Sequence, residues 1–119
     1  MARLAAILIF MMTIFLSCKK QAENDIMIKY IIESYSDSFH AIWEDYNGEE
    51  NLEHSRNRYW SKEEIKGNRH SLSLRFDNRQ GNGYVNTTTS MYIINLNTSD
   101  TLASYDGYFD THSINYNFY

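Results

Sequence analysis

The side chains best suited to catalysis in this chain are its histidines and two groups of carboxylates. No two histidines stand three or four residues apart, so no helical face carries a pair of them; they are His40, His54, His70 and His112. There is no second cysteine and no His-Glu-x-x-His motif, which argues against a metal site. Acidic residues cluster from Glu44 to Glu53 and at Glu63 and Glu64, and a solvated loop explains them more simply than acid–base chemistry. The sequence therefore predicts no catalytic constellation, no metal and no cofactor.

A second group of residues with chemical potential is aromatic and lies mainly in the second half of the chain. The residues that could form a binding face are Trp60, Tyr84, Tyr92, Tyr105, Tyr108 and Tyr116. Tyrosine offers rigid amphipathic area, and the interleaved asparagines offer adaptable hydrogen bonds, a combination that suits recognition of a protein or a sugar. Tyrosine is also a common strand residue and asparagine a common turn residue, so secondary structure alone explains the same pattern.

The only cysteine, Cys18, stands where a hydrophobic run ends and a lysine pair begins. Residues 4–16 are apolar except for Thr13, and Arg3 is the only charge before them. A short charged region followed by about a dozen apolar residues is typical of a secretory signal. A membrane-spanning helix needs roughly 20 apolar residues, so a retained anchor helix is the second interpretation of this run.

The end of the run, Phe15-Leu16-Ser17-Cys18, resembles the lipobox of bacterial lipoproteins, in which a small residue precedes the invariant cysteine. Phe15 stands where leucine is commoner. The resemblance covers residues 1–20 and implies cleavage between Ser17 and Cys18, diacylglycerol on the Cys18 sulfur, and acylation of the new amino end by a fatty acid such as palmitate. The protein would then be anchored in the cell envelope, at the periplasmic or surface face of the outer membrane. An ordinary signal followed by a free thiol is the alternative, and it leaves a reactive cysteine without a disulfide partner.

The domain organisation follows from this reading of the amino end. We expect a signal peptide over residues 1–17, a polar tether over 18–24, and a single domain over 25–119. With Arg3 removed from the 11 basic side chains, 10 remain against 15 acidic ones, so the mature chain is mildly acidic. A nucleic-acid-binding protein needs a basic footprint, so the charge balance argues against nucleic acid as a partner.

The first part of this domain has a helical period. Apolar residues recur in steps of three and four: Ile28, Ile31, Ile32, Tyr35, Phe39, Ile42, Trp43 and Tyr46. This pattern predicts one long amphipathic helix over residues 25–46, with Asn24 or Asp25 as its N-cap and Asn47-Gly48 at its end. A capping-box pattern at residues 61–64, closed by Gly67, predicts a short helical turn.

From residue 71 the period changes to two, which predicts strands. We expect strands over 71–77, 84–96, 101–110 and 112–119, with 84–96 as one long strand or two short ones, a break at Asp106-Gly107, and turns at 77–83 and 97–100. A helix followed by strands predicts an α+β fold in which the long N-terminal helix packs on one face of an antiparallel β-meander. Cystatin-like folds offer an analogy for this arrangement.

One short motif points to modification. Asp100-Thr101-Leu102 resembles the Asp-Ser/Thr-aliphatic sequon at which one Gram-negative phylum O-glycosylates exported proteins. The resemblance implies that Thr101 carries a glycan.

The expected function is that of a small lipid-anchored envelope lipoprotein acting as a protein-binding module. Its partner would be a cognate toxin, which makes the function an immunity function, or a larger envelope assembly. A first alternative is glycan binding through the aromatic face. A second alternative is a small envelope hydrolase, which needs His54, His70 or His112 in a cleft beside a carboxylate.

Overall fold

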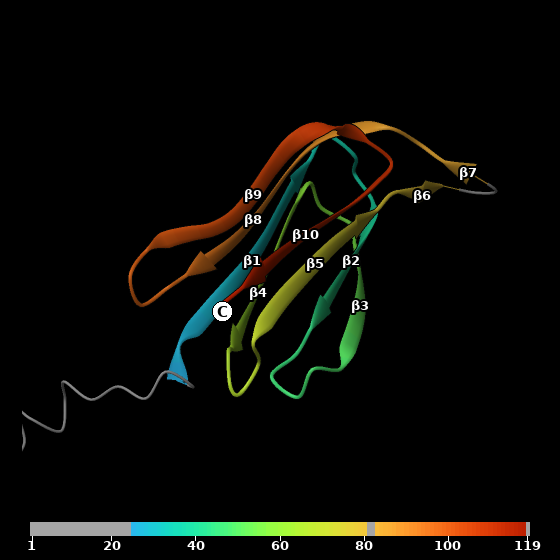
Figure 1. Cartoon of the computed structure of the whole chain (residues 1–119). Coiled ribbons are helices and arrows are strands. Elements are labelled where there is room, and N and C mark those ends of the chain that lie inside the picture. Colours follow the sequence, from blue (N-terminus) through green and yellow to red (C-terminus); the bar gives the residue numbers. More distant parts are fainter. Residues whose placement is uncertain (1–24, 81–82, 119) are drawn as a thin grey trace, which may run out of the picture.

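The strands form two four-stranded antiparallel sheets that pack face to face, with a small two-stranded hairpin at one end (Figure 1). The computed structural model describes residues 25–80 and 83–118. The predicted signal peptide, Cys18 and the tether lie outside these described residues.

Sheet A has the strand order β4-β1-β8-β9 and sheet B the order β10-β5-β2-β3. The strands of sheet A are β1 (Met27–Ser34), β4 (Tyr59–Ile65), β8 (Thr87–Asn95) and β9 (Asp100–Phe109). Those of sheet B are β2 (Phe39–Glu44), β3 (Glu50–Ser55), β5 (Ser71–Asp77) and β10 (Thr111–Asn117). The hairpin consists of β6 (Arg79–Gln80) and β7 (Gly83–Tyr84), and it extends beyond the two sheets between β5 and β8 (Figure 1).

The two halves of the chain repeat one topology. In the first half β1 pairs with β4 in sheet A, and the chain between them crosses to sheet B to form the β2–β3 hairpin. In the second half β5 pairs with β10 in sheet B, and the chain between them crosses to sheet A to form the β8–β9 hairpin. The halves also pair with each other. The first strand of the first half, β1, pairs with β8 of the second half, and the first strand of the second half, β5, pairs with β2 of the first half. The fold is therefore a sandwich of two interlocked halves, not a meander.

The predicted helix over residues 25–46 is wrong, and with it the α+β fold class. These residues form β1, a bend at 35–38, and β2. Side chains at 28, 30, 32 and 34 are buried and alternate with less buried ones, which is the period of a strand. The helical stripe that the sequence suggested includes Tyr35 and Tyr46, and both are exposed.

Local chemistry explains why strands form here. Isoleucine occupies positions 26, 28, 31 and 32, and its branched Cβ favours the strand and lowers helix propensity. The segment Ser34-Tyr35-Ser36-Asp37-Ser38 then offers serine and aspartate side chains that bond to nearby backbone and favour a turn. The predicted short helical turn at 61–67 is also wrong, because residues 59–65 form β4, which pairs with β1.

The strand predictions of the second half are confirmed for the described residues, at 71–77 by β5, at 84–96 by β8, at 101–110 by β9 and at 112–118 by β10. The expected break at Asp106-Gly107 is absent from β9. A Cβ on Gly107 would lie 2.9 Å from Cε1 of Tyr105 and 3.2 Å from Cδ1 of Phe109. A side chain at this position would force the rings of Tyr105 and Phe109, whose centroids lie 5.8 Å apart, to shift, so the glycine leaves space for these rings and does not interrupt the strand.

The core lies between the sheets and is apolar throughout its centre. Its buried residues are Ile28, Tyr30, Ile32, Phe39, Ala41, Trp43, Trp60, Leu72, Leu74, Phe76, Met91, Ile93 and Ile114. The rings of Trp43 in sheet B and Trp60 in sheet A meet across the layers with centroids 5.1 Å apart, and Phe39 and Phe76 pack beside each other within sheet B with centroids 5.2 Å apart. Burying each large side chain contributes about 1.5–3 kcal/mol, so this cluster is the main source of stability.

Arg69 ties the two sheets together at the end where β4 turns into β5. Its guanidinium donates to the Tyr30 hydroxyl in sheet A and to the carbonyl of Glu44 in sheet B. Further bonds run to the carbonyls of Lys66 (3.0 Å) and Ile65 (2.8 Å). Burial raises the pKa of the Tyr30 hydroxyl, and the neighbouring guanidinium opposes part of this shift. The Tyr30 hydroxyl and the carbonyls of Glu44, Ile65 and Lys66 are thereby hydrogen-bonded.

Within residues 25–80 and 83–118 there is no helix with the length and apolar character needed to cross a bilayer.

Candidate functional site

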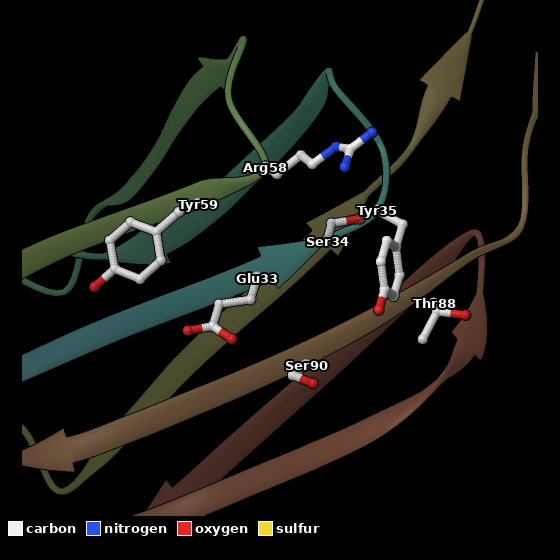
Figure 2. Close-up of a pocket in the computed structure, with 7 residues that line it drawn as sticks. All are labelled: Glu33, Ser34, Tyr35, Arg58, Tyr59, Thr88 and Ser90. Carbon is white, nitrogen blue, oxygen red and sulfur yellow. The ribbon is translucent and has the colours of Figure 1, made fainter.

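A groove of about 370 Å³ opens on the outer face of sheet A, where β1 ends. The residues that line it are Glu33, Ser34, Tyr35, Arg58, Tyr59, Thr88 and Ser90. Figure 2 shows the rings of Tyr59 and Tyr35 on opposite sides of Glu33, with the hydroxyls of Ser90 and Thr88 nearby. The groove therefore has aromatic sides, one carboxylate between them, and hydroxyl groups from the neighbouring strand.

Strand register explains why these side chains meet. Directly opposite residues of an antiparallel pair place their side chains on the same face. Glu33 lies opposite Tyr59 on one side and Ser90 on the other, and Ser90 lies opposite Asp106. A row of four polar or aromatic side chains thus crosses sheet A from β4 to β9, with its middle at the groove.

Backbone hydrogen bonds fix the end of β1 beside the groove. The Ser34 amide donates to the Arg58 carbonyl at 2.7 Å, and the Tyr35 amide donates to the Thr88 carbonyl at 3.0 Å. The two bonds extend the ladders with β4 and β8 by one step beyond the last strand pairs. They hold Tyr35 at the rim, although its side chain is 71% exposed.

Buried hydroxyls support this rim from inside the sandwich. Ser34 points inward, and its Oγ lies 2.9 Å from Oγ1 of Thr89, the residue opposite it on β8. The Ser36 amide donates to Ser34 Oγ, and the Ser36 hydroxyl lies 3.1 Å from Oδ1 of Asn78. Asn78 in turn donates from Nδ2 to the Val85 carbonyl at 2.7 Å. We call Ser34, Ser36, Asn78 and Thr89 the crossover cluster, because it lies where the chain passes from sheet A to sheet B.

The electrostatics of the groove are mildly acidic. Arg58 donates from Nε to Asp37 at 2.9 Å, and both side chains are largely exposed, so this ion pair contributes little to stability. Among the described residues, the Glu33 carboxylate has no ion-pair partner of its own. Lys29, on the same face of β1, stands four residues away, roughly 13 Å along the strand.

The structure divides the aromatic face that the sequence suggested. Tyr92 and Tyr108 lie on the outer face of sheet A, because they stand opposite Ile31 and Thr88. The others lie elsewhere: Trp60 is in the core, Tyr84 packs under Arg79, Tyr105 stacks on His112 with ring centroids 3.9 Å apart, and Tyr116 of β10 packs edge to face with Phe118. The six residues therefore do not form one surface.

Two tyrosines that the sequence did not single out complete the outer face. Tyr35 and Tyr59 join Tyr92 and Tyr108 there, and we call these four residues the tyrosine face. Tyr35 was missed because it was assigned to the helix. The alternation of residues 28–34, taken as a strand, places Glu33 and the following Tyr35 toward solvent.

The histidines lie at separate places in the fold, apart from one stacked pair. His40 and His54 stack on the outer face of sheet B with ring centroids 4.6 Å apart, and His54 Nε2 is hydrogen-bonded to the Ser38 hydroxyl. A catalytic histidine needs an orienting acid, and no hydrogen bond to a carboxylate is found for His54 or His112 among the described residues. In the same part of the chain, no three His, Cys, Asp or Glu side chains are placed to hold a metal ion.

Thr101, the predicted glycosylation site, is exposed near the start of β9, just after the 96–99 turn. It lies opposite Ile94 on the outer face of sheet A, at the end far from the groove. A modifying enzyme could reach this hydroxyl.

Comparison with known proteins gives no relative: no protein-family model, no curated protein and no solved structure matches the chain.

The hydroxyl pair beneath the groove gives a stability prediction. Thr89→Val removes one hydroxyl at nearly constant volume and leaves the buried Ser34 oxygen with one partner fewer. We expect the free energy of unfolding to fall by about 1 kcal/mol, measured by urea titration with tryptophan fluorescence on the chain from residue 19 onward.

Thr88→Val is the matched control, because Thr88 is the exposed neighbour on the other face of the same strand. It should change the free energy of unfolding by less than about 0.5 kcal/mol. Equal effects of the two substitutions would contradict the supporting role of the Ser34–Thr89 pair.

Proposed function

We propose that the protein is a lipid-anchored lipoprotein of a bacterial cell envelope that binds a protein partner and catalyses no reaction. The partner meets the tyrosine face of sheet A. The observation that carries this proposal is the position of four tyrosines on a single sheet surface, with Tyr35 and Tyr59 at the groove and Tyr92 and Tyr108 beyond it.

The composition of this surface supports a protein partner. Tyr35, Tyr59 and Tyr108 are 71%, 48% and 72% exposed, so large aromatic area faces solvent without a role in the core. Exposed aromatic area of this kind marks interaction sites. Tyrosine surrounded by serine and threonine hydroxyls is typical of antibody paratopes, and tyrosine and arginine are common among the residues that dominate binding energy.

The anchor part of the proposal rests on the resemblance of residues 1–20 to a lipoprotein signal. Lipid on Cys18 would be followed by eight residues, 19–26, before β1 begins at Met27. When fully extended, such a segment spans at most roughly 30 Å. The domain would therefore stay close to the membrane, where an envelope assembly or an incoming toxin could meet it.

A glycan is the second candidate ligand, and the groove itself favours it. Two exposed tyrosine rings, one carboxylate and several hydroxyls are groups that can pack against a sugar ring and bond to its hydroxyls. The extent of the tyrosine face beyond the groove, to Tyr92 and Tyr108, is the reason to place a protein first.

Photocrosslinking in cells of the native host tests the proposed surface. Benzoylphenylalanine in place of Tyr108 should give a discrete protein adduct, because this ring lies on the binding face. The same substitution at Tyr46 is the control, since that tyrosine is also exposed but belongs to the β2–β3 turn. Adducts of equal yield at both positions, or at Tyr46 alone, would count against the tyrosine face.

The anchor is tested by mass spectrometry of the N-terminal peptide of the mature protein. We expect the chain to begin at Cys18 and to carry diacylglycerol on sulfur and an acyl chain on the amino group. Several acyl chains on one residue make anchoring stable, so membrane extraction should require detergent. An unmodified Cys18, or cleavage at another position, would remove the anchor from the proposal.

A further inference from the structure

We infer that the groove between Tyr35 and Tyr59 receives a positively charged side chain of the partner, a lysine or an arginine, with Glu33 as its ion-pair partner. This inference rests on the proposed function and names the chemistry of the group that the partner inserts.

The first argument is the position of Glu33. It is exposed, it lies at the groove, and it stands between Tyr59 of β4 and Ser90 of β8. The one arginine in the groove lining, Arg58, already donates to Asp37. A carboxylate between two aromatic rings can bind a cation. Because the described part of the chain does not supply this cation, we expect it to come from the partner.

The second argument is the aromatic sides. A cation near the face of a tyrosine ring is attracted by the ring electrons, and the aliphatic stem of lysine or arginine packs well along the same ring. This chain uses such contacts elsewhere. Arg79 lies 5.2 Å from the Tyr84 ring centroid and donates to the Tyr84 hydroxyl, and Lys66 lies 4.6 Å from the Phe118 ring centroid. A volume of about 370 Å³ leaves room for a guanidinium group and its stem.

The third argument is charge. Glu33 and Arg58 are the charged residues of the groove lining, and Asp37, the ion-pair partner of Arg58, brings the formal charge of these three residues to one negative. The whole chain has a formal charge of −4. Such a field attracts a basic partner and repels acidic ligands, including sulfated or phosphorylated sugars. A neutral sugar gains nothing from it, so the charge favours a cationic group.

The test uses the full lipidated chain in detergent micelles and two short probe peptides, acetyl-Gly-Arg-Gly-amide and the same peptide with citrulline in place of arginine. Citrulline has the shape of arginine without its charge. We expect the arginine peptide at millimolar concentration to shift the ring resonances of Tyr35 and Tyr59 in a saturable way. The citrulline peptide should bind about tenfold more weakly, and added salt should weaken the arginine peptide alone.

Glu33→Gln should reduce the affinity for the arginine peptide about tenfold, to the level of the citrulline peptide. Both side chains have the same shape and the position is exposed, so the fold is expected to remain intact. Glu63→Gln is the matched control, since Glu63 is exposed on the same face of sheet A but lies opposite Lys29, away from the groove. It should leave the affinity unchanged, and Tyr35→Ala should lower it.

The outcomes separate this inference from the function on which it rests. No saturable shift with the arginine peptide, or equal binding to wild type and Glu33→Gln, overturns the cation site. Saturable binding of a neutral disaccharide that Glu33→Gln does not weaken, without arginine binding, assigns the groove to a glycan instead. If a protein adduct still forms at position 108 in either case, the proposed function stands and only the cation site falls.

Discussion

The hydrogen bond between the buried hydroxyls of Ser34 and Thr89 joins the fold to the candidate site. It lies at the last inward-facing position of β1, where the chain leaves sheet A for sheet B. Buried polar groups are costly unless they are paired, so the crossover cluster can persist only in a geometry that satisfies its members together. That geometry turns Ser34 inward and sends the next residue, Tyr35, to the rim of the groove. The shape of the outer surface is therefore a consequence of bonds made inside the sandwich.

At the opposite end of the sandwich, hydrogen bonds from a buried arginine join the two sheets. Arg69 reaches from the β4–β5 turn to Tyr30 in one sheet and to the Glu44 carbonyl in the other. Between Arg69 and the crossover cluster the core is apolar and crosses both sheets. Stability thus comes from inward-facing side chains and the two polar ends. The outward residues of β1, β4, β8 and β9 are not needed for packing, which leaves them available for recognition.

Sequence reasoning predicted the strands after residue 70 because leucine and phenylalanine at 72, 74 and 76 alternate cleanly with polar residues. It failed for residues 25–46. The apolar residues at 31, 35, 42 and 46 lie on outer faces or in turns, but their spacing happens to match the period of a helix. Only pairing with β4 and β8 decides that Ile28, Tyr30 and Ile32 form the buried set. The site was lost for the same reason. Glu33, Tyr59 and Ser90 are far apart along the chain, and only strand register brings them into one row.

Amide hydrogen exchange of the end of β1 tests most directly whether the groove is a preformed part of the fold. The Ser34 and Tyr35 amides donate to the Arg58 and Thr88 carbonyls above the buried hydroxyls. We expect both amides to exchange as slowly as that of Ile32 in the centre of β1, since they should open only when the sandwich unfolds. Exchange as fast as that of Tyr46 in the β2–β3 turn would show that the rim opens independently, and would contradict a groove held in shape by the crossover cluster.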